Sequence, residues 1–207
     1  MLKLASILLA VSVALGSAFY TIAYYVYPVQ PNVCEVRWED EIASTFTVKV
    51  REDLEKAKAA KCKKLVIWLL SPGGSVVHTF ETVRLMEQAK KHNLILEVHG
   101  NTFVASGATF VLAAGSRGYR FIDTNAIYLI HPPRRGGMFQ EPTCLELKET
   151  PKNEDDAVVN ELVKAMARWY SKLSRKSYEE ALSWIKCGTW ATGAKVAIAR
   201  GLADREE

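Results

Sequence analysis

The amino-acid sequence predicts an α/β domain with a mostly parallel sheet and a C-terminal helical part. Residues 65–70 (LVIWLL) form a continuous apolar run, which is typical of a strand buried on both faces in a parallel sheet. Segments of strand and helical character alternate from about residue 36 to residue 130. This order favours right-handed crossovers that place helices against a sheet. The chain has 207 residues, 49% of them hydrophobic, which is enough for one sizeable core.

The individual elements follow from apolar periodicity and from turn residues. Strands are predicted at residues 36–42, 65–70, 94–98, 119–122 and 126–130. Helices are predicted at residues 45–61, 76–91, 155–173, 177–185 and 193–200, with another beginning near Ser106. Residues 132–153 are polar and contain Gly136-Gly137, so we expect a long loop or arm. Loops of this length are usually functional or flexible.

An uncharged run from residue 4 to residue 27 precedes the domain, which we place at residues 34–207. The run exceeds the roughly 20 residues that a membrane helix needs, and its first half also resembles the apolar core of a signal peptide. Both interpretations of residues 1–27 stay open. Lys3 precedes the run and acidic residues follow it. We therefore expect a periplasmic or extracellular domain, either secreted or anchored in the membrane through residues 4–27.

Charge and cysteine usage exclude several classes of function. The formal net charge is +4, and the Lys and Arg residues are scattered, so the sequence does not indicate a nucleic-acid partner. The cysteines form no CxxC pair, and neither a metal nor an organic cofactor is expected. In an oxidising compartment they would form disulfides, for which we predict Cys34–Cys62 and Cys144–Cys187. Four cysteines allow three connectivities, and buried thiols are the alternative.

Three features that could take part in catalysis each follow a predicted strand: Gly73-Gly74, Ser106 and His131. Sites in open α/β sheets collect at the carboxyl ends of strands. Ser106 and His131 would supply a nucleophile and its general base, and the N–H groups of Gly74 and Gly107 would form an oxyanion hole. Taken singly, such residues are more often a turn, a helix N-cap and a structural histidine. Their order along one strand pattern favours a shared site.

The segments SPGGSV, VASGATFVLAAGSRGYRF and NAIYLIHPP, with a GLAD near the C-terminus, resemble the ClpP-type serine peptidases. The resemblance extends from about residue 36 to residue 204 and implies the ClpP/crotonase fold, a β-α-β superhelix. It also implies Ser106 as nucleophile, His131 as base, and Gly74 and Gly107 as the oxyanion hole. Peptide or protein substrates and a homo-oligomer are further implications, with residues 155–175 as a handle-like helix.

The third member of the catalytic triad departs from the family pattern. The turn at residues 190–193 resembles the family segment that follows the aspartate, which puts Gly188 in the place of that aspartate. Glu180 is our candidate for the missing acid. Other acids that could reach the site are Glu179, Asp155 and Asp156. In a chymotrypsin-type enzyme, loss of this charge lowers turnover by about 10⁴-fold.

Two smaller departures lie beside the expected site. Gly107 replaces a bulkier family residue, which predicts additional space next to Ser106. Pro132 replaces the glutamine that follows the family's histidine. Both changes alter the immediate surroundings of the nucleophile and base.

We therefore expect an exported serine endopeptidase that works by acyl transfer through Ser106 and His131. The alternative is a catalytically inactive ClpP-fold protein that acts as an exported module binding a peptide or a membrane protein. A serine–lysine pair is disfavoured, because Lys61, Lys63 and Lys64 lie at the amino end of their strand, far from Ser106. Acyl-thioester chemistry in the crotonase manner would need acyl-CoA, which an exported domain would rarely meet.

Overall fold

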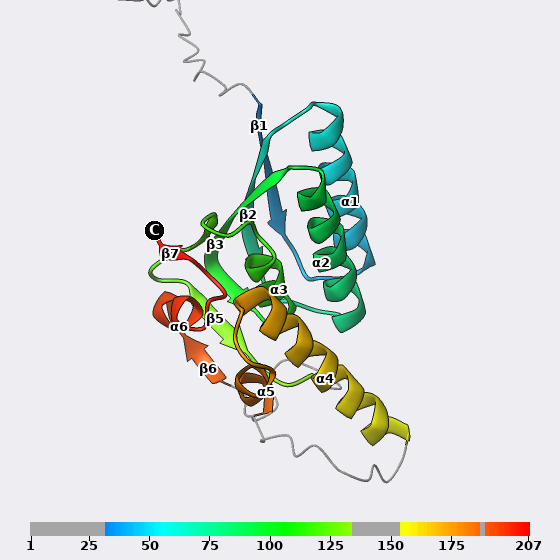
Figure 1. Ribbon diagram of the computed structural model, residues 1–207, viewed down its shortest axis with the longest axis vertical. Helices are drawn as coiled ribbons and strands as arrows, with labels where there is room; N and C mark the ends of the chain where they lie inside the picture. The colour runs from blue at the N-terminus through cyan, green and yellow to red at the C-terminus, as the bar shows by residue number, and fades with distance from the viewer. Residues whose placement is uncertain (1–31, 134–153, 187–188) are drawn as a thin grey trace, which may run out of the picture. The chain divides into compact units, whose positions relative to one another are not determined.

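The computed structural model describes residues 32–133, 154–186 and 189–207 (Figure 1). The chain divides into two units, Met1–Pro31 and Asn32–Glu207, and the second contains all of the described residues. Several predictions therefore lie outside the described residues: the segment at 1–27, most of the loop at 132–153, the pair Cys144–Cys187 and the role of Gly188. Among the residues that are described, no helix is both long and apolar enough to span a membrane.

The described chain alternates strands and helices. The strands are β1 (Val33–Glu39), β2 (Lys64–Ser71), β3 (Ile95–Ala105), β4 (Arg120–Ile122), β5 (Ile127–Ile130), β6 (Thr189–Thr192) and β7 (Arg205–Glu206). The helices are α1 (Ser44–Ala59), α2 (Val76–Lys91), α3 (Gly107–Ala113), α4 (Glu154–Ser174), α5 (Tyr178–Lys186) and α6 (Ala194–Ala199). Most predicted elements are confirmed to within a few residues, including the long helix expected at 155–173.

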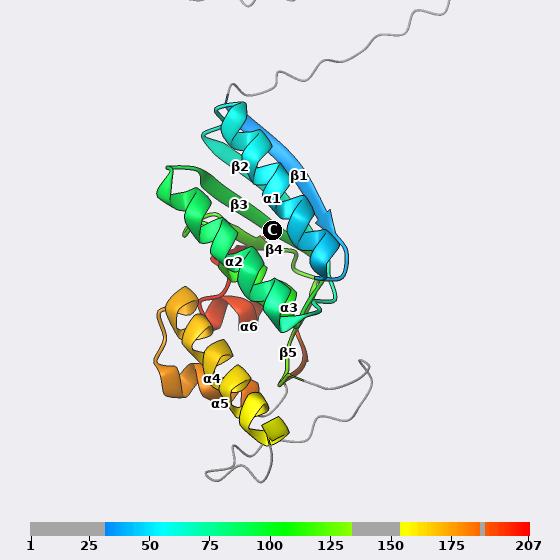
Figure 2. The same ribbon diagram turned by 90° about the vertical axis from the view of Figure 1, so that its right-hand side faces the viewer.

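The sheet has the strand order β1-β2-β3-β4-β7, and all of these neighbours pair in parallel. Helices α1 and α2 cover one face of it, with α3 beside them (Figures 1 and 2). Leu65, Ile67 and Leu69 of β2 are fully buried in the core. This burial accounts for one face of the apolar run at residues 65–70, whereas Leu70 on the other face is 37% exposed, so the predicted burial on both faces is only partly confirmed. The parallel pairings confirm the α/β fold class with a mostly parallel sheet.

Strand β3 is longer than predicted and ends directly before Ser106. The prediction ended this strand at residue 98, whereas it continues to Ala105. Its first half pairs with β2 and β4, and its last residues, Phe103 to Ala105, pair with β5. The pairing with β2 shifts register between Leu69, which pairs with Gly100, and Ser71, which pairs with Val104. Because Asn101 and Thr102 at this irregularity are polar, the apolar pattern did not indicate that the strand continues.

Two short strands were not predicted. β6 was interpreted as a turn, yet it pairs antiparallel with β5, and the Thr192 hydroxyl donates to the Tyr128 carbonyl at 3.0 Å. β7 pairs with β4 through two residues, Arg205 and Glu206. Neither segment has enough length for a recognisable alternation of polar and apolar side chains. Both depend on tertiary partners for their conformation.

A buried ion pair between Arg120 and Asp204 links the C-terminal part of the chain to the sheet. The Arg120 side chain, only 1% exposed, donates to both carboxylate oxygens of Asp204 and to the Gly201 carbonyl. The backbone N–H groups of Gly118 and Arg120 also donate to Asp204. Burial alone would raise the pKa of Asp204, but the hydrogen bonds and charge of Arg120 outweigh it, and the pKa is lowered.

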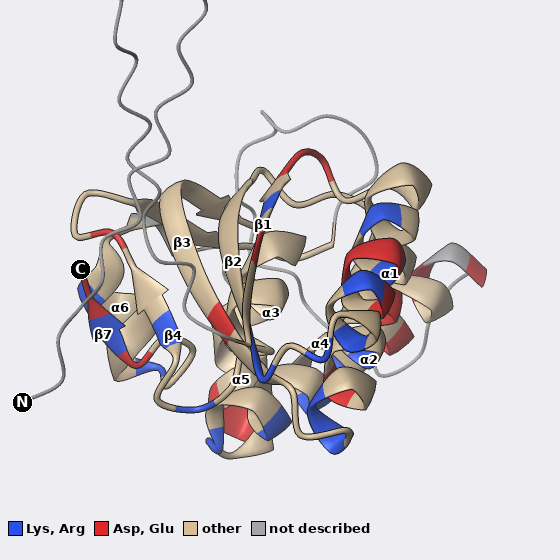
Figure 3. Cartoon of the chain, turned by 90° about the horizontal axis from the view of Figure 1, so that it is seen from above, with Lys and Arg blue, Asp and Glu red and all other residues tan. Residues whose placement is uncertain are grey.

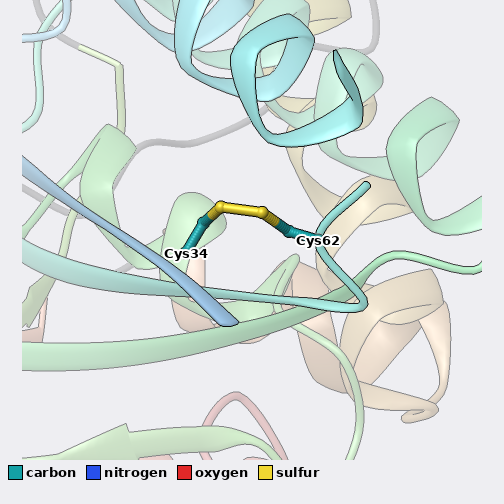
Figure 4. Close-up of a disulfide and its surroundings, with 2 residues drawn as sticks. All are labelled: Cys34 and Cys62. Atoms are coloured by element: carbon teal, nitrogen blue, oxygen red, sulfur yellow. A yellow bond between two sulfur atoms is a disulfide. The ribbon is translucent and has the colours of Figure 1, made fainter. Parts of the chain in front are cut away.

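The predicted disulfide between Cys34 and Cys62 is present (Figure 4). It joins β1 to the connection between α1 and β2, with a Cα–Cα distance of 5.9 Å. The two cysteines are 28 residues apart in the chain. Closing a loop of this size restricts the unfolded chain, which stabilises the folded state.

We expect the double substitution Cys34→Ala and Cys62→Ala to lower the free energy of unfolding by about 3 kcal/mol. For a chain of this size, the loss corresponds to a fall in Tm of about 6–12 °C. Differential scanning calorimetry of the two proteins measures the difference. Peptide mapping without reduction should recover the linked peptides from the wild-type protein, and an unchanged Tm would contradict the structural role.

Asp204→Asn tests the ion pair through its pH dependence. A carboxyl group with a lowered folded-state pKa contributes stability that is present above its unfolded pKa and is lost as the pH falls through its folded pKa. We expect the substitution to destabilise the protein by about 3 kcal/mol at pH 7, and by progressively less as the pH falls below about 4 through the lowered pKa of Asp204. Urea unfolding at both pH values gives the comparison. Asp40→Asn, at an exposed carboxyl group, is the matched control, and an equal loss at both pH values would refute the pairing.

Candidate active site

The predicted site residues lie in one cleft at the carboxyl ends of the strands. Ser106, Gly107, His131 and the Gly73–Gly74 turn all line this cleft, whose volume is about 590 Å³. They come from the ends of β2, β3 and β5, which are neighbours in the sheet. The parallel sheet therefore brings together residues that are distant in sequence, as expected for a site at this edge.

Ser106 has a strained backbone between β3 and α3. Its φ of 53° and ψ of −122° lie outside the regions that residues with a side chain favour. Although Ser106 occupies the N-cap position of α3, its hydroxyl makes no capping hydrogen bond. The sharp turn directs the chain from a strand into a helix and leaves the serine on the wall of the cleft. The simple N-cap interpretation of Ser106 is therefore wrong.

The turn after β2 packs directly against this serine. Gly73 has a φ of +87°, and a Cβ atom there would lie 2.5 Å from the Ala105 carbonyl oxygen and 2.6 Å from the Gly107 nitrogen. Only glycine permits both the conformation and the approach. The Ser71 hydroxyl accepts a hydrogen bond from the Gly73 N–H at 3.1 Å and donates to the Asp40 carbonyl.

Two backbone N–H groups face the region beside Ser106. Ile42 donates to the Gly73 carbonyl at 2.7 Å and accepts from the Ser75 N–H at 2.9 Å, so the intervening Gly74 N–H points away from Ile42. The Gly107 N–H belongs to the first turn of α3, where no intrahelical acceptor exists. Neither N–H donates to another group of the described chain, and both could stabilise an anion.

His131 follows β5, which is tied to the serine by the sheet. Ala105 pairs with Leu129, and the Ser106 N–H donates to the Leu129 carbonyl at 2.8 Å, so His131 lies two residues beyond a residue bonded to the serine. The Nδ1 atom of His131 lies 2.6 Å from the Pro132 carbonyl oxygen. Since a carbonyl can only accept, Nδ1 carries the hydrogen and Nε2 carries the lone pair of the neutral ring. Among the described residues, no hydrogen bond joins Ser106 Oγ to His131.

The structure does not bring Glu180 to this cleft. Glu180 lies in the exposed first turn of α5, and its carboxylate is 3.5 Å from the ammonium nitrogen of Lys176. Glu179 is exposed beside it. The described residues therefore place the Pro132 carbonyl, rather than the carboxylate of Glu180, against His131 Nδ1. Within the same ranges, no group of three or more His, Cys, Asp or Glu residues could hold a metal ion.

Thr79 is a site residue that the sequence did not reveal. It lies on α2, lines the cleft and donates its hydroxyl to the Ser75 carbonyl at 2.9 Å. A Cβ atom on Gly107 would overlap this hydroxyl and would approach the Ile42 side chain to 3.3 Å. The additional space predicted beside Ser106 is therefore absent, because Thr79 fills it. Nothing in the sequence near Thr79 or Gly107 indicated their contact, because they lie on two different helices.

The remaining walls of the cleft are mainly apolar, with one acidic group. Phe80, Phe110 and Met166 contribute apolar surface, and Glu41 contributes a carboxylate. Met166 belongs to α4, so this helix forms part of the cleft. Such walls suit an extended peptide whose side chains are mostly apolar.

A buried hydroxyl network supports the helix that follows Ser106. Thr109 donates its hydroxyl to the Ser106 carbonyl at 2.6 Å, and its Oγ1 is 2.6 Å from the Tyr170 hydroxyl. The Tyr170 ring stacks on Phe110 with centroids 3.8 Å apart. Burial raises the pKa of Tyr170, which keeps its phenol neutral at physiological pH. The turn at Ser106 is thus linked to α4 through Thr109 and Tyr170.

The parallel sheet, its crossover helices and the cleft at the strand ends are those of a ClpP-like α/β protein. The chain matches the family model described as Clp protease over residues 24–205. This protein belongs to the Clp protease family. Clp proteases act on peptide substrates and are typically oligomeric. The resemblance inferred from the SPGG, serine and histidine segments is therefore confirmed at the level of family and fold.

A double-mutant cycle tests the close approach of α2 to Ser106. We expect Gly107→Ala to destabilise the protein by about 2 kcal/mol, because the new methyl group meets the Thr79 hydroxyl. Adding Thr79→Ala should recover about 1 kcal/mol of that loss in urea unfolding. Gly193→Ala is the matched control, since a Cβ atom there meets nothing within 4 Å and φ is −81°. Strict additivity of the first two substitutions would contradict the contact.

Proposed function

We propose that this protein is a serine endopeptidase in which Ser106 is the nucleophile and His131 the general base. The observation that carries the proposal is the convergence of a strained serine, a histidine with a defined tautomer and two available N–H groups in one cleft. Membership of the Clp protease family supports peptidase activity. Strain at a residue facing a cleft is often associated with function.

In the proposed reaction, the Ser106 oxygen attacks the carbonyl carbon of a peptide bond while its proton moves to His131 Nε2. The N–H groups of Gly74 and Gly107 bind the oxyanion of the tetrahedral intermediate. The protonated imidazole then gives its proton to the leaving amine, and an acyl-enzyme remains. A water molecule, deprotonated by the same histidine, attacks the ester, and collapse of the second intermediate releases the acid and restores Ser106.

We propose that the Pro132 carbonyl orients His131 through its Nδ1 atom. A carbonyl fixes the ring and its tautomer, which is the first task of the third triad member. It carries a partial charge, so it stabilises the imidazolium less than a carboxylate would. A serine and histidine that are not hydrogen-bonded without substrate are compatible with this role, because catalytic hydrogen bonds often tighten only with substrate bound.

The location and assembly are part of the same proposal. The Cys34–Cys62 disulfide supports an oxidising compartment, and the uncharged run at residues 4–27 supports export, by secretion or by anchoring in a membrane. Family membership supports a homo-oligomer. We propose a periplasmic or extracellular peptidase acting on peptides or unfolded segments that enter the cleft.

Labelling with a fluorophosphonate probe tests the proposed nucleophile. We expect the full-length wild-type protein to be labelled at Ser106, and labelling to be abolished by Ser106→Ala. His131→Ala should lower peptide hydrolysis by at least about 10⁴-fold. Mass spectrometry locates the adduct, and a peptide-library digest measures turnover. Ser106→Ala should move Tm by less than about 2 °C, because the hydroxyl makes no hydrogen bond in the described chain.

Glu180→Gln is the matched control in both assays. We expect it to leave labelling and turnover unchanged, because its carboxylate pairs with Lys176. A decrease in turnover of tenfold or more would instead support Glu180 as the acid of the triad. Equal absence of labelling and hydrolysis in the wild-type protein and all variants would instead favour the inactive peptide-binding protein.

A further inference from the structure

A second cavity lies at the opposite end of the sheet from Ser106. It has a volume of about 580 Å³ and is lined by the ends of α1 and α2 and by the connections that lead into β2 and β3. Leu54, Leu85 and Leu94 give it an apolar floor. We call it the basic cavity, because Arg51, Lys58, Lys61, Lys63, Lys91 and His92 line it against a single carboxylate, that of Glu55.

Three of these cations are not neutralised. Arg51 pairs with Glu81, and the ammonium nitrogen of Lys58 is 4.0 Å from Glu55. In contrast, Lys61, Lys63 and Lys91 form no ion pair with any residue of the described chain. Elsewhere on α1 and α2, acidic and basic residues are interspersed (Figure 3). The basic cavity is therefore a local excess of positive charge around an apolar floor, which suits an anionic ligand with an apolar part.

The helix dipole accounts for only one of the three lysines, Lys91. Lysines in the last turn of a helix interact favourably with its dipole, and Lys91 is in such a position on α2. Lys61 and Lys63 lie beyond the end of α1. Lys61 also has a φ of 56°, in the left-handed region where glycine is preferred after a helix. A lysine is thus present at a position whose backbone conformation favours a residue without a side chain.

The basic cavity adjoins the point where the chain enters the domain. The Asn32 carbonyl accepts hydrogen bonds from the N–H groups of Lys63 and Lys64, at 2.7 and 3.2 Å. Residue 27, the end of the uncharged run, precedes Asn32 by five positions. Five extended residues reach about 18 Å at most. The basic cavity is therefore near the uncharged run in sequence, and the inference drawn from it rests on the proposed membrane location of that run.

We propose that the basic cavity binds the phosphate head group of an anionic phospholipid. The three lysines would contact the phosphate, while the apolar floor would receive the adjoining glycerol and the start of an acyl chain. The ligand would orient the domain on the membrane. Because the cleft of Ser106 lies at the other end of the strands, it would face away from the bilayer and stay open to substrates.

Vesicle sedimentation tests this site with the full-length protein. Vesicles contain phosphatidylcholine alone or phosphatidylcholine with phosphatidylglycerol, so that the apolar run contributes equally to both measurements. We expect phosphatidylglycerol to raise the partition coefficient at least about tenfold at low salt. The variant with Lys61→Gln, Lys63→Gln and Lys91→Gln should lose this increase. The matched control, Lys56→Gln with Lys164→Gln and Lys195→Gln, loses the same charge outside the cavity and should keep it.

Salt and a soluble competitor distinguish a specific lipid site from nonspecific adsorption. High salt should remove the increase in the wild-type protein, which checks the electrostatic origin without any variant. An equal loss in both triple variants, or no effect of phosphatidylglycerol, would overturn the proposal. Displacement by soluble glycerol phosphate at the concentration of accessible phosphatidylglycerol would identify a free phosphate ester instead and would also overturn it. Fluorophosphonate labelling of Ser106 should be the same in both triple variants. A negative lipid-binding result would therefore not count against the peptidase proposal.

Discussion

The contact between the Gly73 turn and the backbone around Ser106 is the constraint on which the site depends. Gly73 lies where any side chain would collide with residues 105–107, so the turn after one strand and the turn after the next strand form a single packed unit. Gly74, Ser106 and Gly107 thus line the same cleft. The contact also explains why the strain at Ser106 persists, because the surrounding backbone allows no relaxation.

Much of this architecture could be predicted from the sequence, because it depends on strong local patterns. Neighbouring residues indicated the apolar run at residues 65–70 and the serine and histidine at strand ends. The even number of cysteines indicated disulfides, of which Cys34–Cys62 is present. The extension of β3, the strand β6 and the overlap of Thr79 with Gly107 have no such signal. These features arise from tertiary packing between segments that are far apart in the chain. Glu180 was chosen for its place in the sequence, whereas the partner of His131 Nδ1 is a backbone atom that composition cannot indicate.

The two ends of the sheet differ in the chemistry that they present. At the carboxyl ends, backbone N–H groups and one imidazole surround an alcohol in a mainly apolar cleft. At the amino ends, lysine side chains surround an apolar floor near the start of β1. The first end suits a reaction in which negative charge develops on a carbonyl oxygen. The second suits a permanent anion, so one scaffold has room for both a reaction site and an attachment site.

The cleft residues come from three separate crossovers, which affects when the site forms during folding. Gly73, Ser106 and His131 meet only after β2, β3 and β5 have joined edge to edge, and none of these pairings is local in sequence. Long-range pairings of this kind form slowly, because the chain loses conformational entropy on closing before the new contacts stabilise it. Under the proposed function, a partly folded chain would therefore lack the assembled site, and activity would appear only once the sheet is complete.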